Sequence, residues 1–326
     1  MPEKNMSRRG FISKGAAVAG AACLAGCATQ SETQTSSKKS SKPLKVRYGL
    51  NLLLYTAAFT KDKVDLIQKV ADFGYDGVEV PFNDLSLLDA KATAAAREKA
   101  KMGLTACCVL LPGMNLVSEK AEERKAGVDQ IRKMIDIAAE MGGDTVAGPI
   151  YSPVGLLTRK ARTDQEWKWC AEGLRAAADH AEKARIMLAI EPLNRFETYV
   201  FNTDADAARM AKEVGSPNLK IQIDTFHANI EERDTAAAIR ATGDMLGHFH
   251  ASESYRGTPG TGQVKWKEVF AALKDIGYDR WVTIESFATG ILDLCAAACI
   301  WRPIYDSADG LARDGLKFLK EMSRSA

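Results

Sequence analysis

From residue 46 onward, short apolar runs rich in β-forming residues alternate with amphipathic helical stretches, and this alternation constrains the fold more than any other feature. Such alternation is typical of parallel strands joined by crossover helices. There are eight runs, each followed by a helical segment: Val46–Asn51, Gly77–Val80, Leu104–Leu110, Thr145–Pro149, Ile186–Ile190, Leu219–Ile223, Leu246–His250 and Trp281–Ile284. Eight β/α units in about 280 residues match the usual size of a TIM barrel, so we predict a (β/α)8 barrel of the α/β class as a single domain.

A doubly wound parallel sheet is the alternative fold for the same alternation. A dinucleotide-binding sheet of this kind carries a GxGxxG turn after its first strand, and no such turn follows Val46–Asn51. Acidic and histidine side chains also end several of the later runs, which is typical of a barrel mouth. We therefore favour the barrel.

The first 43 residues differ in composition from the rest and are interpreted as export and tethering segments. The sequence SRRGF at residues 7–11 is similar to a twin-arginine signal, and the apolar stretch at residues 15–25 is too short to span a bilayer. The sequence LAGC at residues 24–27 is similar to a bacterial lipobox, in which Cys27 is lipidated and becomes the new N-terminus.

These motifs divide the chain into three predicted parts. Residues 1–26 form a signal peptide, residues 27–43 form a flexible polar tether, and residues 44–326 form the folded domain. The predicted partners are the twin-arginine export machinery and a membrane, which the lipid on Cys27 would reach. The predicted protein is an exported lipoprotein anchored at the periplasmic or extracellular face of a membrane.

The balance of charges argues against a polyanionic partner. Lys and Arg total 44 against 42 Asp and Glu, a formal net charge of +2, and removal of residues 1–26 would leave −1. A nucleic-acid-binding surface is ordinarily strongly basic, so we expect no nucleic-acid partner. Seven cysteines without a CxxC pair exclude a disulfide framework or a structural zinc site as the basis of the fold.

Four consecutive predicted strands end in a side chain that can bind a metal, namely Glu191, Asp224, His250 and Glu285. The carboxyl ends of barrel strands converge on one mouth, so the four side chains should point into one pocket. A single acid at a strand end is ordinarily a helix cap or an ion-pair partner. Three carboxylates buried together without a cation would be costly, however, and this favours a metal site. The donor set is hard and rich in oxygen, so Mn²⁺ is the favoured ion, with Mg²⁺ or Co²⁺ as alternatives.

Several stretches of the domain resemble the ketose 3-epimerases, the family that includes D-tagatose, D-allulose (psicose) and L-ribulose 3-epimerases. The stretches span nearly the whole domain and read GPIYS at 148–152, EPLNRFE at 191–197, DTFH at 224–227, HASE at 250–253, RG at 256–257, GTG at 260–262, ESF at 285–287 and WR at 301–302. The export signal and the tether depart from this family, whose familiar members are cytoplasmic, and this departure leaves the natural substrate open.

The resemblance implies roles for individual residues. Glu191, Asp224, His250 and Glu285 would hold the divalent metal, and Glu191 and Glu285 would also act as the acid/base pair on the two faces of a ketose. The resemblance also implies contacts with the sugar. Its hydroxyl and carbonyl groups would be bound by Glu197, His227 and Arg256, and the pocket would be lined by Phe287. A homo-oligomer, dimer or tetramer, is implied in the same way.

The leading hypothesis is therefore an isomerase that epimerises ketoses at C3 through a cis-enediolate with a bound divalent metal. An aldose–ketose isomerase or a hydroxypyruvate-type isomerase would use the same metal and enediol chemistry. An exported protein could also epimerise a 3-keto glycoside, or serve as a non-catalytic sugar-binding lipoprotein. A barrel-type DNA repair nuclease would need more histidine ligands than the four histidines present and a basic groove.

Three further features have a structural and a functional interpretation. The loop at residues 257–262 follows the seventh run, where TIM barrels often bind phosphate, but we interpret it as a tight loop that carries Arg256. Cys107 and Cys108 are interpreted as packed small apolar residues. His248 precedes His250 by two residues and should point the same way, either as a partner of the metal site or as a core residue.

Overall fold

The computed structural model describes residues 44–326. The predicted signal peptide at 1–26, the tether at 27–43 and the lipidation residue Cys27 lie outside the described residues. Within residues 44–326, no helix combines the length and the apolar character needed to cross a membrane.

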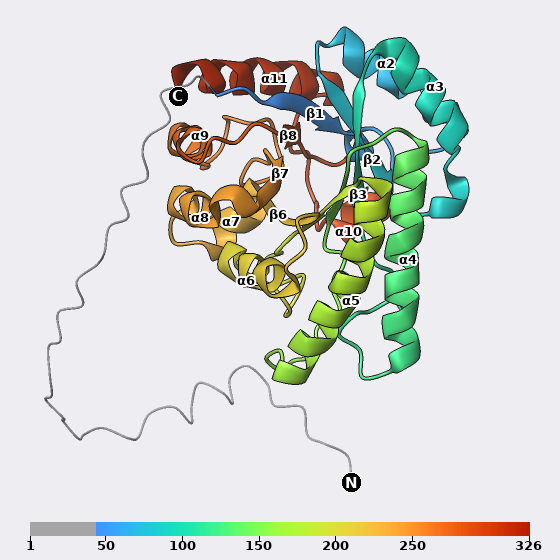
Figure 1. Cartoon of the computed structure of the whole chain (residues 1–326). Coiled ribbons are helices and arrows are strands. Elements are labelled where there is room, and N and C mark those ends of the chain that lie inside the picture. The colour runs from blue at the N-terminus through green and yellow to red at the C-terminus, as the bar shows by residue number, and fades with distance from the viewer. Residues whose placement is uncertain (1–43) are drawn as a thin grey trace, which may run out of the picture. The chain divides into compact units, whose positions relative to one another are not determined.

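Eight parallel strands close into a barrel in the order of the chain, as predicted, and the doubly wound alternative is wrong (Figure 1). The strands are β1 (Arg47–Asn51), β2 (Gly77–Phe82), β3 (Gly103–Cys108), β4 (Thr145–Gly148), β5 (Met187–Ile190), β6 (Leu219–Asp224), β7 (Leu246–His250) and β8 (Trp281–Ile284). The third strand is shorter than expected, because Leu110 leaves the sheet and forms an isolated bridge with Pro153. Pairing of β8 with β1 closes the ring and leaves no free strand edge.

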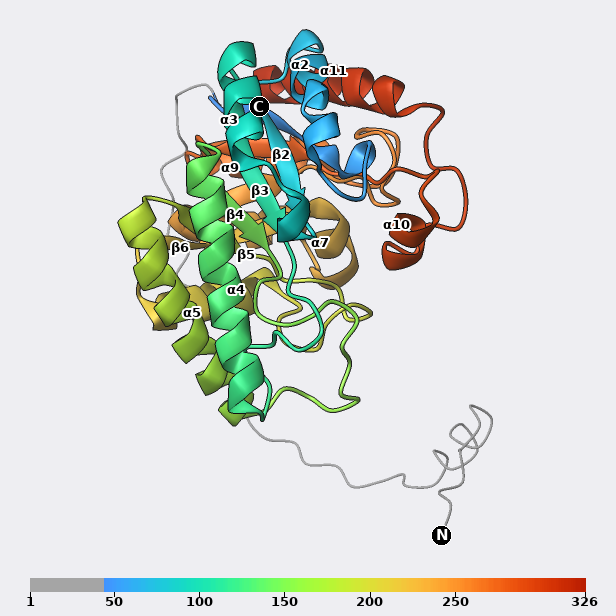
Figure 2. The same cartoon turned by 90° about the vertical axis from the view of Figure 1, so that its right-hand side faces the viewer.

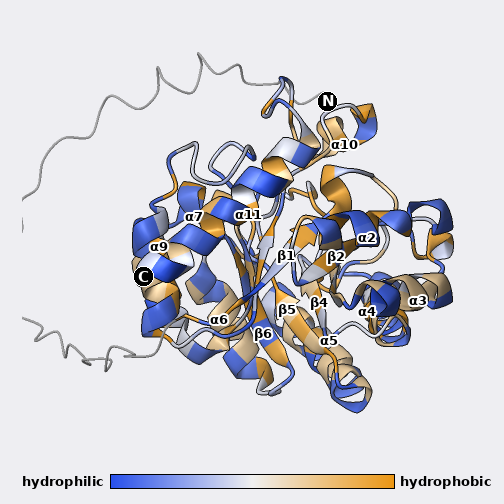
Figure 3. Cartoon of the chain, turned by 90° about the horizontal axis from the view of Figure 1, so that it is seen from above, coloured by the Kyte–Doolittle hydropathy of each residue, from blue (hydrophilic) through white to orange (hydrophobic). Residues whose placement is uncertain are grey.

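Helices surround the barrel and cover its outer face (Figure 1). They are α2 (Asp65–Asp72), α3 (Ala90–Ala100), α4 (Ala121–Glu140), α5 (Asp164–Ala184), α6 (Asp204–Val214), α7 (Thr225–Glu231), α8 (Thr235–Thr242), α9 (Trp266–Asp275), α10 (Leu292–Ala297) and α11 (Ala308–Ser325). Short 3₁₀ turns lie at Leu52–Leu54, Lys61–Lys63, Leu85–Leu87 and Gly243–Met245. Seen from above, apolar residues concentrate on the strands and on the helix faces that contact them (Figure 3).

Local sequence sets where several helices begin. Thr163 caps α5 and exchanges hydrogen bonds with Glu166 in a capping box, and Thr203 caps α6 by accepting a hydrogen bond from the Asp206 amide. Helix α10 lies apart from the ring of helices, beside the barrel mouth, in two perpendicular views (Figures 2 and 3). Its inner face therefore contributes to the site and not to the outer shell.

Trp281 fills the amino-terminal end of the barrel. Its ring lies against Gly77 and Gly103, where a Cβ at either position would overlap the indole. Its indole N–H donates to the Asp144 carboxylate at 3.1 Å, and the Arg47 guanidinium stacks on its face at 4.0 Å. This end of the barrel is therefore packed, and the site can lie only at the opposite, carboxyl end.

A shift in the pairing of β6 with β7 decides which residues meet at that carboxyl end, because Gly247 of β7 is passed over in the register. The pairing of β6 with β7 shifts by one residue between Ile221 and Gln222, so that Asp224 pairs with His250. An unshifted register would pair Asp224 with Phe249, and a one-residue slip exchanges the two faces of a strand. The bulge thus directs Asp224 and His250 toward the same interior space.

Candidate active site

The four predicted metal ligands lie where the sequence placed them, at the carboxyl ends of β5 to β8. Asp224 and His250 are the last residues of β6 and β7, while Glu191 and Glu285 directly follow β5 and β8. All four side chains are buried. Asp224, His250 and Glu285 form a group of donor atoms close enough to share one metal ion, and Asp224 also forms such a group with Glu191 and His227.

The distances in the first group are short. His250 Nδ1 lies 3.5 Å from Glu285 Oε2 and 3.7 Å from Asp224 Oδ2. In the second group, His227 Nε2 lies 3.9 Å from Glu191 Oε1. His227 was predicted to contact the sugar, so its position beside Glu191 and Asp224 places that sugar-binding candidate directly against the predicted metal ligands.

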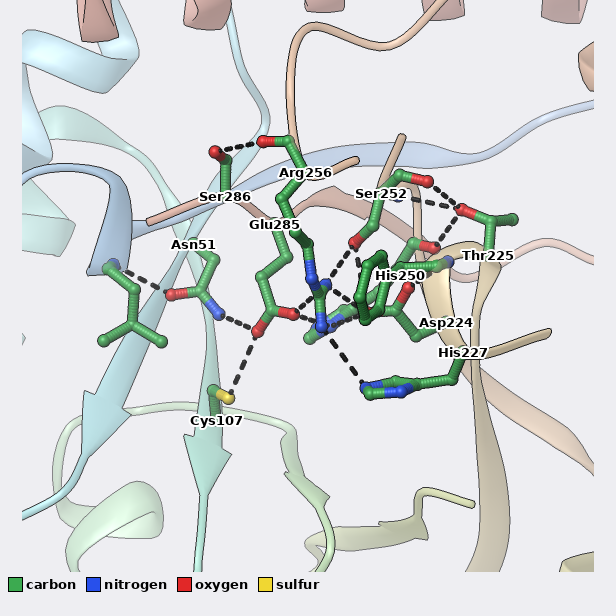
Figure 4. Close-up of polar contacts among 12 residues, drawn as sticks. Asn51, Cys107, Asp224, Thr225, His227, His250, Ser252, Arg256, Glu285 and Ser286 are labelled. Atoms are coloured by element: carbon green, nitrogen blue, oxygen red, sulfur yellow. Dashed lines mark hydrogen bonds and ion pairs between the residues drawn. The ribbon is translucent and has the colours of Figure 1, made fainter. Parts of the chain in front are cut away.

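Arg256 joins the two groups (Figure 4). Its Nη1 donates to Asp224 Oδ2 and to Glu285 Oε2, each at 2.7 Å, and its Nη2 lies 3.3 Å from His227 Nε2. The guanidinium also packs on the Phe226 ring at 4.1 Å. Its backbone adopts a φ of 64°, an unusual value for a residue other than glycine, which the hydrogen bond from Ser286 Oγ to its carbonyl oxygen helps to hold.

Burial and neighbouring charges shift the pKa values of this cluster in opposite directions. Burial raises the pKa of Glu191 well above its usual value, and the nearby Asp224 and Glu285 carboxylates add to the shift. Burial acts the same way on Asp224, but the Arg256 guanidinium together with His250 and His227 outweighs it and holds the Asp224 pKa well below its usual range. Binding of a divalent cation here would favour the ionised carboxylates and release protons.

The pKa values of the two histidines of the site are also shifted in opposite directions. Burial lowers the pKa of His227 to about 4, so this imidazole is neutral at pH 7. The Asn194 amide N–H donates to His227 Nδ1 at 3.1 Å, which leaves the ring proton on Nε2, the nitrogen that faces Glu191. Burial opposes the charged form of His250 too, but Glu79 and Glu285 raise its pKa well above the usual value.

A cavity of about 330 Å³ opens at the barrel mouth, and the predicted catalytic and sugar-binding residues line it. The predicted residues in its wall are Glu191, Glu197, His227, Arg256, Glu285 and Phe287. Its outer wall is largely apolar, with contributions from the β3 and β4 loops and from Leu294 and Ala297 of α10. Glu197 accepts a hydrogen bond from Asn194 at 2.7 Å, so it also supports the side chain that contacts His227.

Sequence reasoning missed the buried polar residues behind the cluster. Glu79 in β2 is 0% exposed, and its carboxylate lies 2.6 Å from His250 Nε2. Asn51 at the end of β1 donates both to Glu79 and to Glu285. Glu79 lies in mid-strand and not at a strand end, so the strand-end pattern does not include it. The signal that could have found it is an acid inside an otherwise apolar run.

Two of the other sequence features have a clear place in the structure. His248 points into the barrel interior like His250, as predicted, and its Nε2 lies 2.7 Å from Glu79 Oε2 without hydrogen-bond alignment. Cys107 is buried as predicted but lines the cavity, with its Sγ 3.8 Å from Glu285 Oε1 (Figure 4).

The loop at residues 257–262 is held by a carboxylate of the chain itself. Glu253 accepts hydrogen bonds from the backbone N–H groups of Ser254, Gly260 and Val264 and from the Trp266 indole. The Gly260 amide of the loop and the flanking amides of Ser254 and Val264 are therefore used within the chain, and the Thr261 amide donates to the Thr258 carbonyl. This favours the interpretation of a tight loop carrying Arg256 over a phosphate site.

Comparison with protein families gives a match to the xylose isomerase-like TIM barrel model over residues 67–322. The chain is 31% identical over 277 residues to a probable ketose 3-epimerase of Synechocystis sp., covering 85% of this chain and 96% of that relative. It is 36% identical over 248 residues to a D-psicose 3-epimerase of Agrobacterium fabrum, covering 74% and 86% of the two chains.

A solved structure shows the same similarity in three dimensions. The D-allulose 3-epimerase from Methylomonas sp. in complex with D-allulose superimposes with a TM-score of 0.82 at 30% identity, over 87% of this chain and 100% of that one. Epimerases are isomerases, so these relatives agree with the enzyme class predicted from the sequence.

Proposed function

Because the chain belongs to the xylose isomerase-like TIM barrel family, we propose that it is a metal-dependent enzyme that epimerises ketoses at C3. The observation that carries this proposal is one cavity whose wall holds two carboxylates from different strands, Glu191 and Glu285, beside the donors His227 and Arg256. Inversion at one carbon requires acid/base groups on both faces of the sugar, and Glu191 and Glu285 would serve in this role.

The residues present fit a divalent metal. Three carboxylates and one imidazole, from Glu191, Asp224, His250 and Glu285, belong to two groups of ligand atoms that share Asp224, and His227 completes the group that contains Glu191. This hard donor set favours Mn²⁺, with Mg²⁺ or Co²⁺ as alternatives. A bound divalent ion would supply Lewis-acid stabilisation of the oxyanion that develops as the proton leaves.

The side chains of the cavity account for the proton transfers. One of Glu191 and Glu285 removes the C3 proton to give a planar cis-enediolate, and the other delivers a proton to the opposite face. His227, neutral with its proton on Nε2, and Arg256 donate hydrogen bonds to the sugar oxygens, and Glu197 accepts from its hydroxyl groups. Phe287 and the apolar outer wall would exclude water from the far end of the sugar.

Isotope incorporation tests this proposal and separates its alternatives. The Mn²⁺-loaded protein is incubated with D-fructose, D-tagatose and L-ribulose in heavy water, and the position of deuterium is read by NMR. Deuterium at C3 of an epimerised ketose is the expected result. Deuterium at C1 without C3 would indicate an aldose–ketose isomerase, and sugar binding without any exchange would indicate a receptor.

The export and the anchoring proposed from the sequence accompany this function. The twin-arginine motif at residues 7–11 would carry a folded, metal-loaded domain out of the cytoplasm, and Cys27 would tether it to the membrane through a lipid. Replacing Arg8 and Arg9 by Lys should retain an active precursor inside the cell. Cys27→Ala should release the domain from membranes without loss of activity, and the purified protein should be a dimer or tetramer by light scattering.

A further inference from the structure

One buried carboxylate lies beneath the site and contacts it from the far side of the barrel. Glu79 projects from β2, whereas His250 and His248 project from β7, which is not adjacent to β2 in the sheet. All three side chains are 0% exposed. An ionised carboxylate at such depth is costly unless its oxygens are paired, so its contacts bear directly on its role.

Each oxygen of Glu79 has defined partners. Oε1 lies 2.6 Å from His250 Nε2 and accepts from Asn51 Nδ2 at 3.0 Å. Oε2 accepts from Thr105 Oγ1 at 2.8 Å, with His248 Nε2 nearby. The Asn51 amide and the Thr105 hydroxyl donate to different oxygens of this side chain, so both oxygens of Glu79 act as acceptors.

An acceptor at Nε2 determines which nitrogen of His250 can bind a metal. A cation that binds here would displace one proton from His250, and Nε2 would keep its proton toward Glu79. The lone pair offered to the metal would then be that of Nδ1, which faces Asp224 and Glu285 and lies 3.0 Å from Gln222 Nε2. The same network reaches a second ligand. Asn51 donates through its amide group to Glu79 Oε1. It also donates to Glu285 Oε1 at 3.1 Å, which leaves Glu285 Oε2 toward the site (Figure 4).

We infer that Glu79 is a positioning residue for the metal site: it fixes His250 directly, and Glu285 through Asn51, with their ligand atoms turned toward Asp224. This inference rests on the proposed function for its biological meaning. Its test does not, because metal affinity is measured separately from epimerisation.

The experiment titrates the EDTA-stripped full-length protein with Mn²⁺ and reads free Mn²⁺ by electron paramagnetic resonance. Glu79→Gln keeps the volume but sets an amide N–H against one of its donors, and it should weaken Mn²⁺ affinity by about 10–100-fold. The spectrum of the bound ion should broaden, a change that a purely structural role would not produce.

Glu253→Gln is the matched control. Glu253 is also 0% exposed and is held by four donors, but those donors belong to the loop after β7 and to the Trp266 indole. This variant should lose thermal stability while retaining Mn²⁺ affinity within about threefold, a difference of less than 1 kcal/mol. Equal losses of affinity in both variants would overturn the inference.

A double variant tests whether Glu79 acts through His250. In a His250→Asn background, Glu79→Gln should add little further loss of Mn²⁺ affinity, because the interaction is already removed. Fully additive losses would overturn the inference. If Glu79→Gln does not fold, Thr105→Val decides: removal of this hydroxyl donor should weaken Mn²⁺ binding by up to about 10-fold, and unchanged binding would contradict the role.

The outcomes also separate this inference from the proposed function. If the wild-type protein binds Mn²⁺ but exchanges no C3 proton, the epimerase proposal is contradicted. A loss of Mn²⁺ affinity in Glu79→Gln would still support the positioning role. Normal Mn²⁺ affinity and an unchanged spectrum in folded Glu79→Gln would remove the positioning role alone.

Discussion

The substitution Glu191→Gln should raise the stability of the metal-free fold while lowering the catalytic activity. Among residues 44–326 the Glu191 carboxylate has one ion-pair contact, His227 Nε2 at 3.9 Å, and no hydrogen bond. Its backbone is held independently, because its N–H donates to Gly148 O and its carbonyl accepts from Tyr151. A glutamine of the same shape therefore fits without breaking a bond, and the change removes only the charge and the proton-transfer group.

The effect on the metal-free protein follows from the direction of the pKa shift. Burial raises the pKa of Glu191 in the fold, so the wild-type carboxyl costs stability once the unfolded chain would ionise, above about pH 4.5, and costs none below it. Glu191→Gln removes this cost. At pH 7 the metal-free variant should be the more stable protein, with each kcal/mol raising the melting temperature by about 2–4 °C.

In the presence of metal and substrate, the wild type should have the advantage over Glu191→Gln. The variant loses a charged ligand, so Mn²⁺ should stabilise it less than the wild type, and loss of the acid/base group should lower C3 exchange by at least about 10²–10⁴-fold. The assays are thermal unfolding by circular dichroism between pH 4 and 8, with EDTA or Mn²⁺, and deuterium exchange at C3. A metal-free variant less stable than wild type at pH 7, or one with wild-type exchange, would refute this reasoning.

Three further perturbations should act in ways that the structure distinguishes. Trp281→Ala should destabilise the fold by about 3–5 kcal/mol in urea unfolding, with kcat unchanged, because the indole fills the end of the barrel opposite the site. Asp204→Asn should stabilise the protein at pH 7 but not at pH 3, since burial, with Glu232 nearby, raises the Asp204 pKa and its Oδ2 lacks a partner among the described residues. EDTA should abolish exchange and lower the melting temperature, and Mn²⁺ at about 100 times its dissociation constant should restore about 2.7 kcal/mol.

Local sequence patterns predict the helices and strands of this protein and the end of the barrel at which its chemistry lies. The strand-forming runs and the helices between them are local signals, because strand and helix periodicities are carried by neighbouring residues. Glu191, Asp224, His250 and Glu285 could be found for the same reason: each ends a strand, and the carboxyl ends of barrel strands converge.

Which of these side chains contact one another, and through which partners, depends on how the folded barrel brings distant segments together. The register shift at Gly247 sets Asp224 opposite His250, and no local pattern indicates a one-residue shift in pairing. Glu79 reaches His250 across the interior of the barrel from a strand 171 residues earlier in the chain. Strand register and contacts of this kind join segments that are distant along the chain, so they depend on the closure of the whole barrel. Local periodicity does not predict them.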